Sequence, residues 1–256
     1  MLMSKPDKDA LESKIRNSAR TLRLSNATMD WFLGQATPKA LQVVDGLLDH
    51  ELDVRHDNRH ARLLRQAKFP AVKSVSSFDA SDLQYQEGYG WEELVSLDWL
   101  AKHQDFVFHG PTGRGKTHLS IGLGMLAIDS GKSVRFLSAA QLVLDLQRAR
   151  DCGRLDERYQ ELSKCDLLIL DEFGYIPLDS DGGRLLFQVM SNCYERQSMV
   201  ITTNIEFSKW GTVLADEKLA SALVDRVVHH GRLVEFGGQS RRVTDSLMLG
   251  NRKEED

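Results

Sequence analysis

Two glycines, a lysine and a threonine stand at a spacing suited to phosphate binding in the stretch GPTGRGKTHLS, which begins at Gly110. The order matches G-x-x-x-x-G-K-[ST] and lies between an apolar run and a helix-like pattern. In such a loop the backbone N–H groups converge on phosphate oxygens, the lysine reaches the β and γ phosphates, and the hydroxyl ligates Mg²⁺. We therefore predict a nucleotide site. Its predicted residues are Gly110, Pro111, Thr112, Gly113, Arg114, Gly115, Lys116, Thr117 and His118, with Lys116 also catalytic and Thr117 a metal ligand.

A pair of acidic residues ends another apolar run, in the stretch LLILDE. Asp171 is placed to hold Mg²⁺ through water, and Glu172 is a carboxylate able to polarise an attacking water. A phosphate loop alone is compatible with a kinase, a GTPase or an ATPase, but a small-molecule kinase has no need of a water-activating Glu here. The pair therefore favours nucleotide hydrolysis. The alternative is that Glu172 is a surface acid at the end of a strand.

Short apolar runs alternate with helix-length segments and must position these groups. The runs occupy residues 106–110, 133–138, 166–171, 199–204 and 233–236. Helical patterns lie after Lys116, in AQLVLDLQRAR and in GRLLFQVMSNCYER. Strands that are nearly continuous in apolar residues and separated by helices indicate a parallel sheet covered on both faces. We predict an α/β core domain over 105–246, a connector at 69–104 and a disordered tail at 247–256.

The first 68 residues have a different pattern. Apolar residues recur there at spacings of three and four, which predicts a small all-helical domain. A break falls at GQATPK, where Thr37 can cap the next helix and Pro38 can open it. Between residues 55 and 73, six Lys or Arg face a single acid, so this stretch is either a phosphate-contact surface or a solvated helix face. The candidates for DNA contact here are Arg59, Arg62 and Arg65.

Composition narrows the class of protein. The chain has 256 residues and a formal net charge of −4, which argues against a surface coated uniformly for nucleic acid. Three scattered cysteines lack the spacing of a zinc site or a disulfide framework. No apolar stretch approaches the roughly 18 to 20 residues of a membrane span, and the N-terminal sequence lacks the apolar core of a secretory signal. We expect a cytoplasmic protein without a membrane partner.

Taken together, these residues resemble the IstB-like ATP-binding family, the AAA+ helper proteins of insertion-sequence transposition that are related to DnaC-type helicase loaders. The resemblance covers roughly residues 60–245. It rests on GPTGRGKTHLS, DLLILDEFGYIPLD, LLFQVMSNCYER, VITTNIEFSKWGTVLADEKLASALVDRVVHH and GGQSRR, in that order. It implies a P-loop NTPase core of AAA+ type that uses ATP and Mg²⁺, with a nucleotide site shared between subunits.

The resemblance also implies roles for residues outside the loop. Asn204 matches the polar residue that helps to position the attacking water, Arg226 matches an arginine finger that reaches a neighbouring subunit's nucleotide, and Arg242, rather than Arg241, matches a cis sensor. From the residues alone, Asn204 is equally well a strand-terminating turn, and Arg226 is better explained by an ion pair with Asp225 or Glu217.

In related initiators and loaders a helical element after the second strand of the core grips DNA. The corresponding segment here offers Arg148, Arg150 and Arg154, although acids alternate with these arginines as in an ordinary solvated helix.

These features predict an ATPase that assembles as a homo-oligomeric ring or filament on duplex DNA, without sequence specificity, and recruits a partner transposase. Two alternatives share most of the evidence. A DnaC-like loader would deliver a replicative helicase, and a nucleotide-binding scaffold would use bound ATP as a switch without needing hydrolysis.

Overall fold

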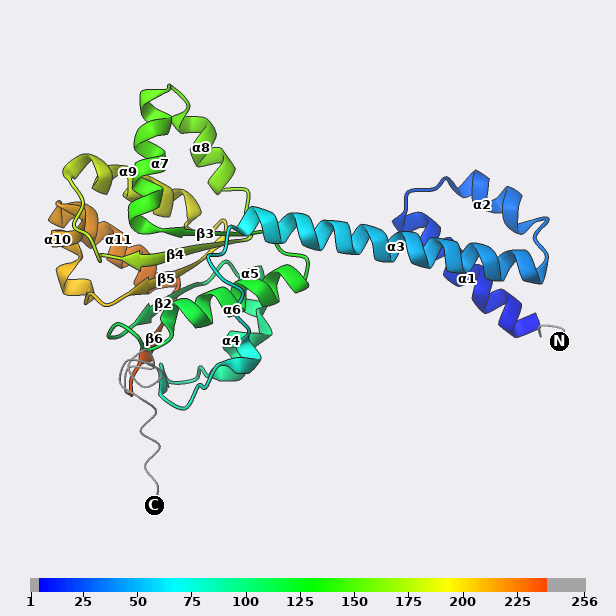
Figure 1. Ribbon diagram of the computed structural model, residues 1–256, viewed down its shortest axis with the longest axis horizontal. Coiled ribbons are helices and arrows are strands. Elements are labelled where there is room, and N and C mark those ends of the chain that lie inside the picture. The colour runs from blue at the N-terminus through cyan, green and yellow to red at the C-terminus, as the bar shows by residue number, and fades with distance from the viewer. Residues whose placement is uncertain (1–4, 239–256) are drawn as a thin grey trace, which may run out of the picture. The chain divides into compact units, whose positions relative to one another are not determined.

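The computed structural model describes residues 5–238, and its chain divides into two compact units between Arg62 and Leu63. The tail predicted at 247–256 therefore lies outside the described residues. The first unit is helical (Figure 1). Its helices are α1 (Lys5–Thr21), α2 (Asn26–Leu33) and α3 (Pro38–Ala67), the last of which continues into the second unit.

The helical unit has its own small core and capped helix ends. Ile15 of α1 and Leu41 of α3 are fully buried within this core. Thr37 caps α3 as the sequence predicts, because its hydroxyl accepts a hydrogen bond from the Ala40 N–H at 3.3 Å and Pro38 is the first helical residue. The apolar spacing read from the sequence thus corresponds to packed helices.

The second unit is built on a six-stranded sheet in the order β1-β6-β2-β5-β4-β3. The strands are β1 (Leu83–Tyr85), β2 (Asp105–His109), β3 (Val134–Ser138), β4 (Leu167–Phe173), β5 (Ser198–Thr203) and β6 (Gly231–Phe236). Strands β2 to β6 are mutually parallel, and their bounds lie close to the five predicted apolar runs. The short β1 strand, which was not predicted, pairs with β6 in the antiparallel sense.

Helices cover both faces of this sheet, as Figure 1 shows. Leu167 and Ile169 of β4 point into one cluster with α6 (Lys116–Asp129). Leu168 and Leu170 point into the other cluster with α7 (Ala139–Asp151), α9 (Ser180–Cys193), α10 (Trp210–Leu214) and α11 (Glu217–His230). This alternation explains why β4 is apolar at every position: both of its faces are buried. The other α-helices described in this unit are α4 (Trp91–Ser96), α5 (Asp98–Ala101) and α8 (Leu155–Leu162).

The segment at 69–104, which was predicted to be a connector, is packed into this unit. Its buried side chains Phe78, Leu94 and Trp99 belong to the same cluster as α6. The Trp99 indole N–H donates to the Leu94 carbonyl oxygen at 2.9 Å, which satisfies the polar end of a fully buried ring.

Between residues 5 and 238 no helix is long and apolar enough to cross a membrane.

Asp105, at the start of β2, is a buried carboxyl that couples folding to pH. It is 2% exposed, accepts the Met199 N–H at 2.7 Å, and burial raises its pKa to about 7. The native state therefore holds a proton that the unfolded chain releases near its ordinary pKa of 3.8, so stability from this group falls as pH rises from about 4 to about 7.

We predict that Asp105→Asn, which keeps the acceptor oxygen without the charge, raises Tm relative to wild type, and does so more at about pH 8 than at about pH 5. The expected difference is on the order of 2 kcal/mol, or several degrees, in thermal melts. Asp53→Asn, at an exposed position of α3, is the control and should show no such pH-dependent gain. An equal effect of Asp105→Asn at both pH values would contradict the prediction.

Candidate nucleotide-binding site

The phosphate loop connects the end of β2 to the start of α6, the strand-to-helix setting that the sequence predicts. Two glycines are required by close approaches of other groups. A Cβ at Gly110 would lie 2.5 Å from the Phe236 carbonyl oxygen, and one at Gly115 would lie 2.8 Å from the Phe78 ring. Gly115 also has a φ of 91° and is the N-cap of α6, so the loop must turn in a conformation that larger residues disfavour.

A cleft of about 590 Å³ opens beside this loop, within the size range of small-molecule sites. Phosphate-loop residues from Thr112 to His118 form its floor. One wall comes from the segment before β1, and the other from the ends of β4 and β5. The walls are lined by Pro70, Ala71, Lys73, Ser77 and Phe78 on one side, and by Glu172, Tyr175, Thr202, Thr203 and Asn204 on the other.

The lysine and the arginine of the loop have different surroundings. The Lys116 ammonium donates to the carbonyl oxygens of Gly110 at 2.5 Å and Pro111 at 2.8 Å, so it lies folded against the loop that it belongs to. Arg114 lines the cleft, and its Nε and Nη1 are buried without a hydrogen-bond partner. Both cations thus stand where phosphate oxygens are expected to bind, on the floor of the cleft.

Asp171 lies at the centre of a hydrogen-bond cluster beside the loop. Its carboxylate is 6% exposed and accepts the Thr117 hydroxyl, at 2.9 Å to Oδ1 and 3.1 Å to Oδ2. The Thr202 hydroxyl also donates to Oδ1, at 2.5 Å. A hydroxyl and a carboxylate in contact are the hard oxygen donors that Mg²⁺ takes when phosphate and water complete its shell. Thr117 and Asp171 therefore fit the metal role predicted for them.

Glu172 turns away from the core into the cleft. A register shift in the pairing of β4 with β5 between Leu170 and Phe173 leaves it bulged, with a φ of 57° and an exposed side chain between two buried neighbours. Its N–H donates to the Thr202 hydroxyl at 2.9 Å. The sequence shows that Asp171 and Glu172 are neighbours, but it does not predict that the Asp171 side chain is buried beside the loop while the Glu172 side chain lies in the cleft. The bulge separates them.

Comparison with known proteins agrees with this geometry. The sequence profile described as "IstB-like ATP binding protein" matches residues 33–248. The chain belongs to this family. It is 38% identical over 208 residues to an insertion sequence IS232 putative ATP-binding protein of Bacillus thuringiensis subsp. berliner, covering 80% of this chain and 82% of that protein. An insertion sequence IS21 putative ATP-binding protein of Pseudomonas aeruginosa is 34% identical, with 85% and 83% covered.

Among solved structures, the DnaC helicase loader matches with a TM-score of 0.50 and 21% identity, covering 57% of this chain and 85% of that one. At this identity the likeness establishes the fold alone. The fold class and the family resemblance predicted from the sequence are both confirmed.

The remaining predicted site residues of this IstB-like protein lie in three different places. Asn204 follows β5 and lines the cleft. Arg226 lies on α11, away from the cleft lining, where its Nη1 donates to the Ser191 hydroxyl at 2.9 Å and its guanidinium stands 5.2 Å from the Phe187 ring centroid. The ion pair with Asp225 or Glu217 considered from the sequence does not form in the part of the chain that the structure describes. Arg241 and Arg242 lie outside the described residues.

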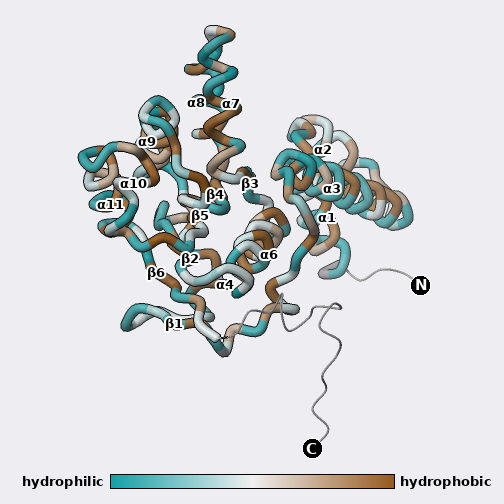
Figure 2. Tube along the Cα trace, turned by 60° about the vertical axis from the view of Figure 1, so that its left-hand side comes forward, coloured by the Kyte–Doolittle hydropathy of each residue, from teal (hydrophilic) through white to brown (hydrophobic). Residues whose placement is uncertain are grey.

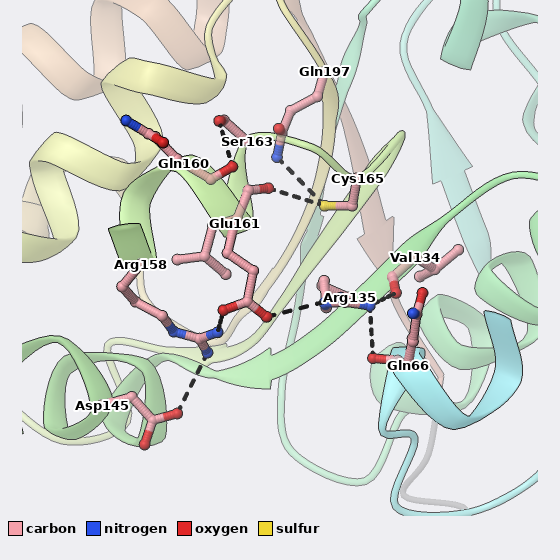
Figure 3. A network of polar contacts seen from close by, with 11 residues as sticks. Gln66, Val134, Arg135, Asp145, Arg158, Gln160, Glu161, Ser163, Cys165 and Gln197 are labelled. Atoms are coloured by element: carbon pink, nitrogen blue, oxygen red, sulfur yellow. Dashed lines mark hydrogen bonds and ion pairs between the residues drawn. The ribbon is translucent and has the colours of Figure 1, made fainter. Parts of the chain in front are cut away.

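The arginines of α7 and α8 fall into two groups. Arg150 pairs with Asp181 at 3.4 Å, and Arg158 bonds to Glu161 at 2.7 Å and approaches Asp145 at 3.6 Å. Figure 3 shows that Glu161 in turn faces Arg135, so Arg158 belongs to a network within the unit. The Arg158 hydrogen bond lowers the pKa of Glu161.

Arg148 and Arg154, by contrast, are exposed and make no ion pair within residues 5–238. The other DNA-contact candidates, Arg59, Arg62 and Arg65, are exposed along α3.

Proposed function

We propose that this IstB-like protein is an ATP-hydrolysing, DNA-binding helper of a transposase. The observation that carries the proposal is the cleft in which a phosphate loop, a metal-suited Thr117–Asp171 pair and an exposed Glu172 meet. A pure binding site would need the first two features, but a carboxylate turned into the cleft beside them is suited to activating water.

The roles follow from the contacts. The loop N–H groups and Lys116 bind the ATP phosphates, and for this Lys116 leaves the Gly110 and Pro111 carbonyl oxygens that it now contacts. Mg²⁺ held by Thr117 and Asp171 would supply charge neutralisation on the phosphates. Glu172 accepts a proton from the attacking water, and Asn204, at the end of the neighbouring strand, helps to orient that water.

In this proposal, the nucleotide state of the protein controls whether subunits assemble. In the proposed oligomer, Arg226 of one subunit completes the site of the next, so a nucleotide at that interface stabilises the assembled state by its higher affinity for it. Loss of the γ-phosphate then removes the bias and releases subunits. The association of its relatives with insertion sequences supports a transposase as the partner that the assembly recruits.

The first experiment measures ATP turnover with and without duplex DNA, with particle size followed in parallel. We expect ATP to promote assembly on DNA and DNA to change the turnover rate. A protein that stays monomeric and ignores DNA would contradict the proposal. Pull-down with the transposase against a hexameric helicase separates the helper from a DnaC-like loader, for which the likeness of fold to a helicase loader is the supporting observation.

The DNA surface is proposed to include α7 and α8, which extend beyond the sheet in Figure 2. Because Arg148 and Arg154 are the members of this group free of acidic partners, they are the better candidates for phosphate contact, whereas Arg150 is engaged by Asp181.

We predict that the double variant Arg148→Ala/Arg154→Ala binds duplex DNA about tenfold more weakly whatever its sequence, and that the slope of log K against log salt flattens by about 2. Fluorescence anisotropy titrations over a salt series measure both quantities. Lys102→Ala/Arg196→Ala removes the same charge from other exposed positions and is the matched control. If both double variants lose the same amount of DNA affinity, the loss follows from net charge alone, and a local contact surface at Arg148 and Arg154 is excluded.

A further inference from the structure

A continuous hydrogen-bond path joins the two acidic residues of the site through one side chain of the neighbouring strand. The Glu172 N–H donates to the Thr202 hydroxyl oxygen at 2.9 Å, and the same hydroxyl donates to Asp171 Oδ1 at 2.5 Å. Thr202 is 2% exposed, so water does not compete for either bond. The buried Thr202 hydroxyl thus accepts a hydrogen bond from one residue, Glu172, and donates one to the residue before it, Asp171.

The two hydrogen bonds of Thr202 fix the Glu172 backbone N–H and the Asp171 carboxylate, and both groups have a reason to need a fixed position. Glu172 has a φ of 57°, a left-handed conformation that side chains with a Cβ disfavour, and the bulge removes part of its regular pairing to β5. Its N–H finds a partner only because a hydroxyl reaches it from β5. Asp171 Oδ1 receives the Thr117 hydroxyl as well, so Thr117 and Thr202 fix the carboxylate from two elements.

The next residue of β5 secures the other end of the bulge. The Thr203 hydroxyl donates to the Phe173 carbonyl oxygen at 2.8 Å and accepts the Ile205 N–H at 3.0 Å. Two successive threonines therefore hold the three residues from Asp171 to Phe173. Valine has the same shape and strand preference as threonine but offers no hydrogen bond, so packing alone does not account for threonine at 202.

We propose that Thr202 is a positioning residue that couples the metal-binding carboxylate of Asp171 to the orientation of Glu172. This inference rests on the proposed ATPase function. Through Thr202, a change in how Asp171 is held alters the backbone amide that sets the direction of the Glu172 side chain. Thr202 takes no part in the reaction itself.

The test compares Thr202→Val, which removes the hydroxyl, with Thr202→Ser, which keeps it. Two readouts are needed: steady-state ATP turnover, and the Mg²⁺ concentration that gives half-maximal binding of a fluorescent ATP analogue. Removing an outer partner of a metal ligand costs about 10- to 100-fold in activity or metal affinity, so Thr202→Val is expected to lose turnover and to need more Mg²⁺ on this scale. Binding of the analogue without Mg²⁺ should stay within about threefold, and Thr202→Ser should approach wild type.

Ser198→Ala is the matched control, because Ser198 is a fully buried hydroxyl at the other end of β5 that donates to the Trp99 carbonyl oxygen. It should lower Tm without changing turnover or the Mg²⁺ requirement. Thr202→Ala gives a second variant without the hydroxyl, so the comparison with Thr202→Ser stands even if the valine variant does not fold.

Wild-type turnover and Mg²⁺ requirement in the variants without the hydroxyl would overturn the inference, as would equal losses in Thr202→Ser. If the wild-type protein binds but does not hydrolyse ATP, the proposed function fails while the Mg²⁺ titration still tests Thr202. The two failures are therefore distinguishable.

Discussion

Glu172→Gln is expected to reduce ATP turnover at least about a hundredfold while ATP affinity stays within a few fold of wild type. The amide has the shape of the carboxylate but does not accept a proton from water. The backbone bond from the Glu172 N–H to Thr202 does not involve the side chain, so the bulge and the Asp171 cluster should persist. Turnover under single- and multiple-turnover conditions, with analogue binding in parallel, separates the two effects.

The same variant should accumulate as an ATP-bound assembly on DNA, because subunits that bind but do not hydrolyse have no route to release. Sizing in the presence of DNA and ATP measures this directly. Glu206→Gln, at an exposed acid outside the cleft, is the control for loss of charge. If Glu172→Gln loads onto DNA and leaves it like wild type, the nucleotide acts as a switch without hydrolysis, and the scaffold alternative is correct.

The chemistry of phosphate binding explains why the centre of the site is readable in the sequence. A loop that brings backbone N–H groups to phosphate restricts Gly110 and Gly115, and the structure gives a separate steric reason at each, the Phe236 carbonyl oxygen and the Phe78 ring. Strands buried on both faces restrict β4 to apolar residues until Asp171. These constraints act within short stretches of the chain, so they leave a motif or an apolar run that can be recognised in the sequence.

The parts that were missed depend on contacts between distant residues. Threonine is a common residue in strands, so Thr202 does not stand out in the sequence. Its role is visible only when the β4 bulge places the Glu172 N–H beside it. One cleft wall comes from the segment at 69–104, whose small polar residues are typical of a connector, although its aromatic residues anchor it to the sheet cluster. Three-residue β1 is too short to produce a period in the sequence.

Arg226→Ala is expected to lower ATP turnover about a thousandfold in the assembled protein and to leave nucleotide binding by the isolated chain unchanged. The second expectation follows from position, since Arg226 does not line the cleft of its own chain and instead contacts Ser191 and Phe187 of α9. Arg226→Lys keeps the charge but lacks the planar fork, and should recover little activity.

Mixing two inactive variants tests whether the arginine acts between subunits. An Arg226→Ala subunit retains Glu172, and a Glu172→Gln subunit retains Arg226, so a competent site forms wherever they adjoin in the right order. Random equimolar mixing should restore about a quarter of wild-type turnover in a head-to-tail assembly. No recovery, together with near-normal turnover and a lowered Tm in Arg226→Ala alone, would assign Arg226 to packing of α11 on α9. The Ser191 contact makes that outcome a definite alternative, because loss of the guanidinium would leave a half-buried hydroxyl without its donor.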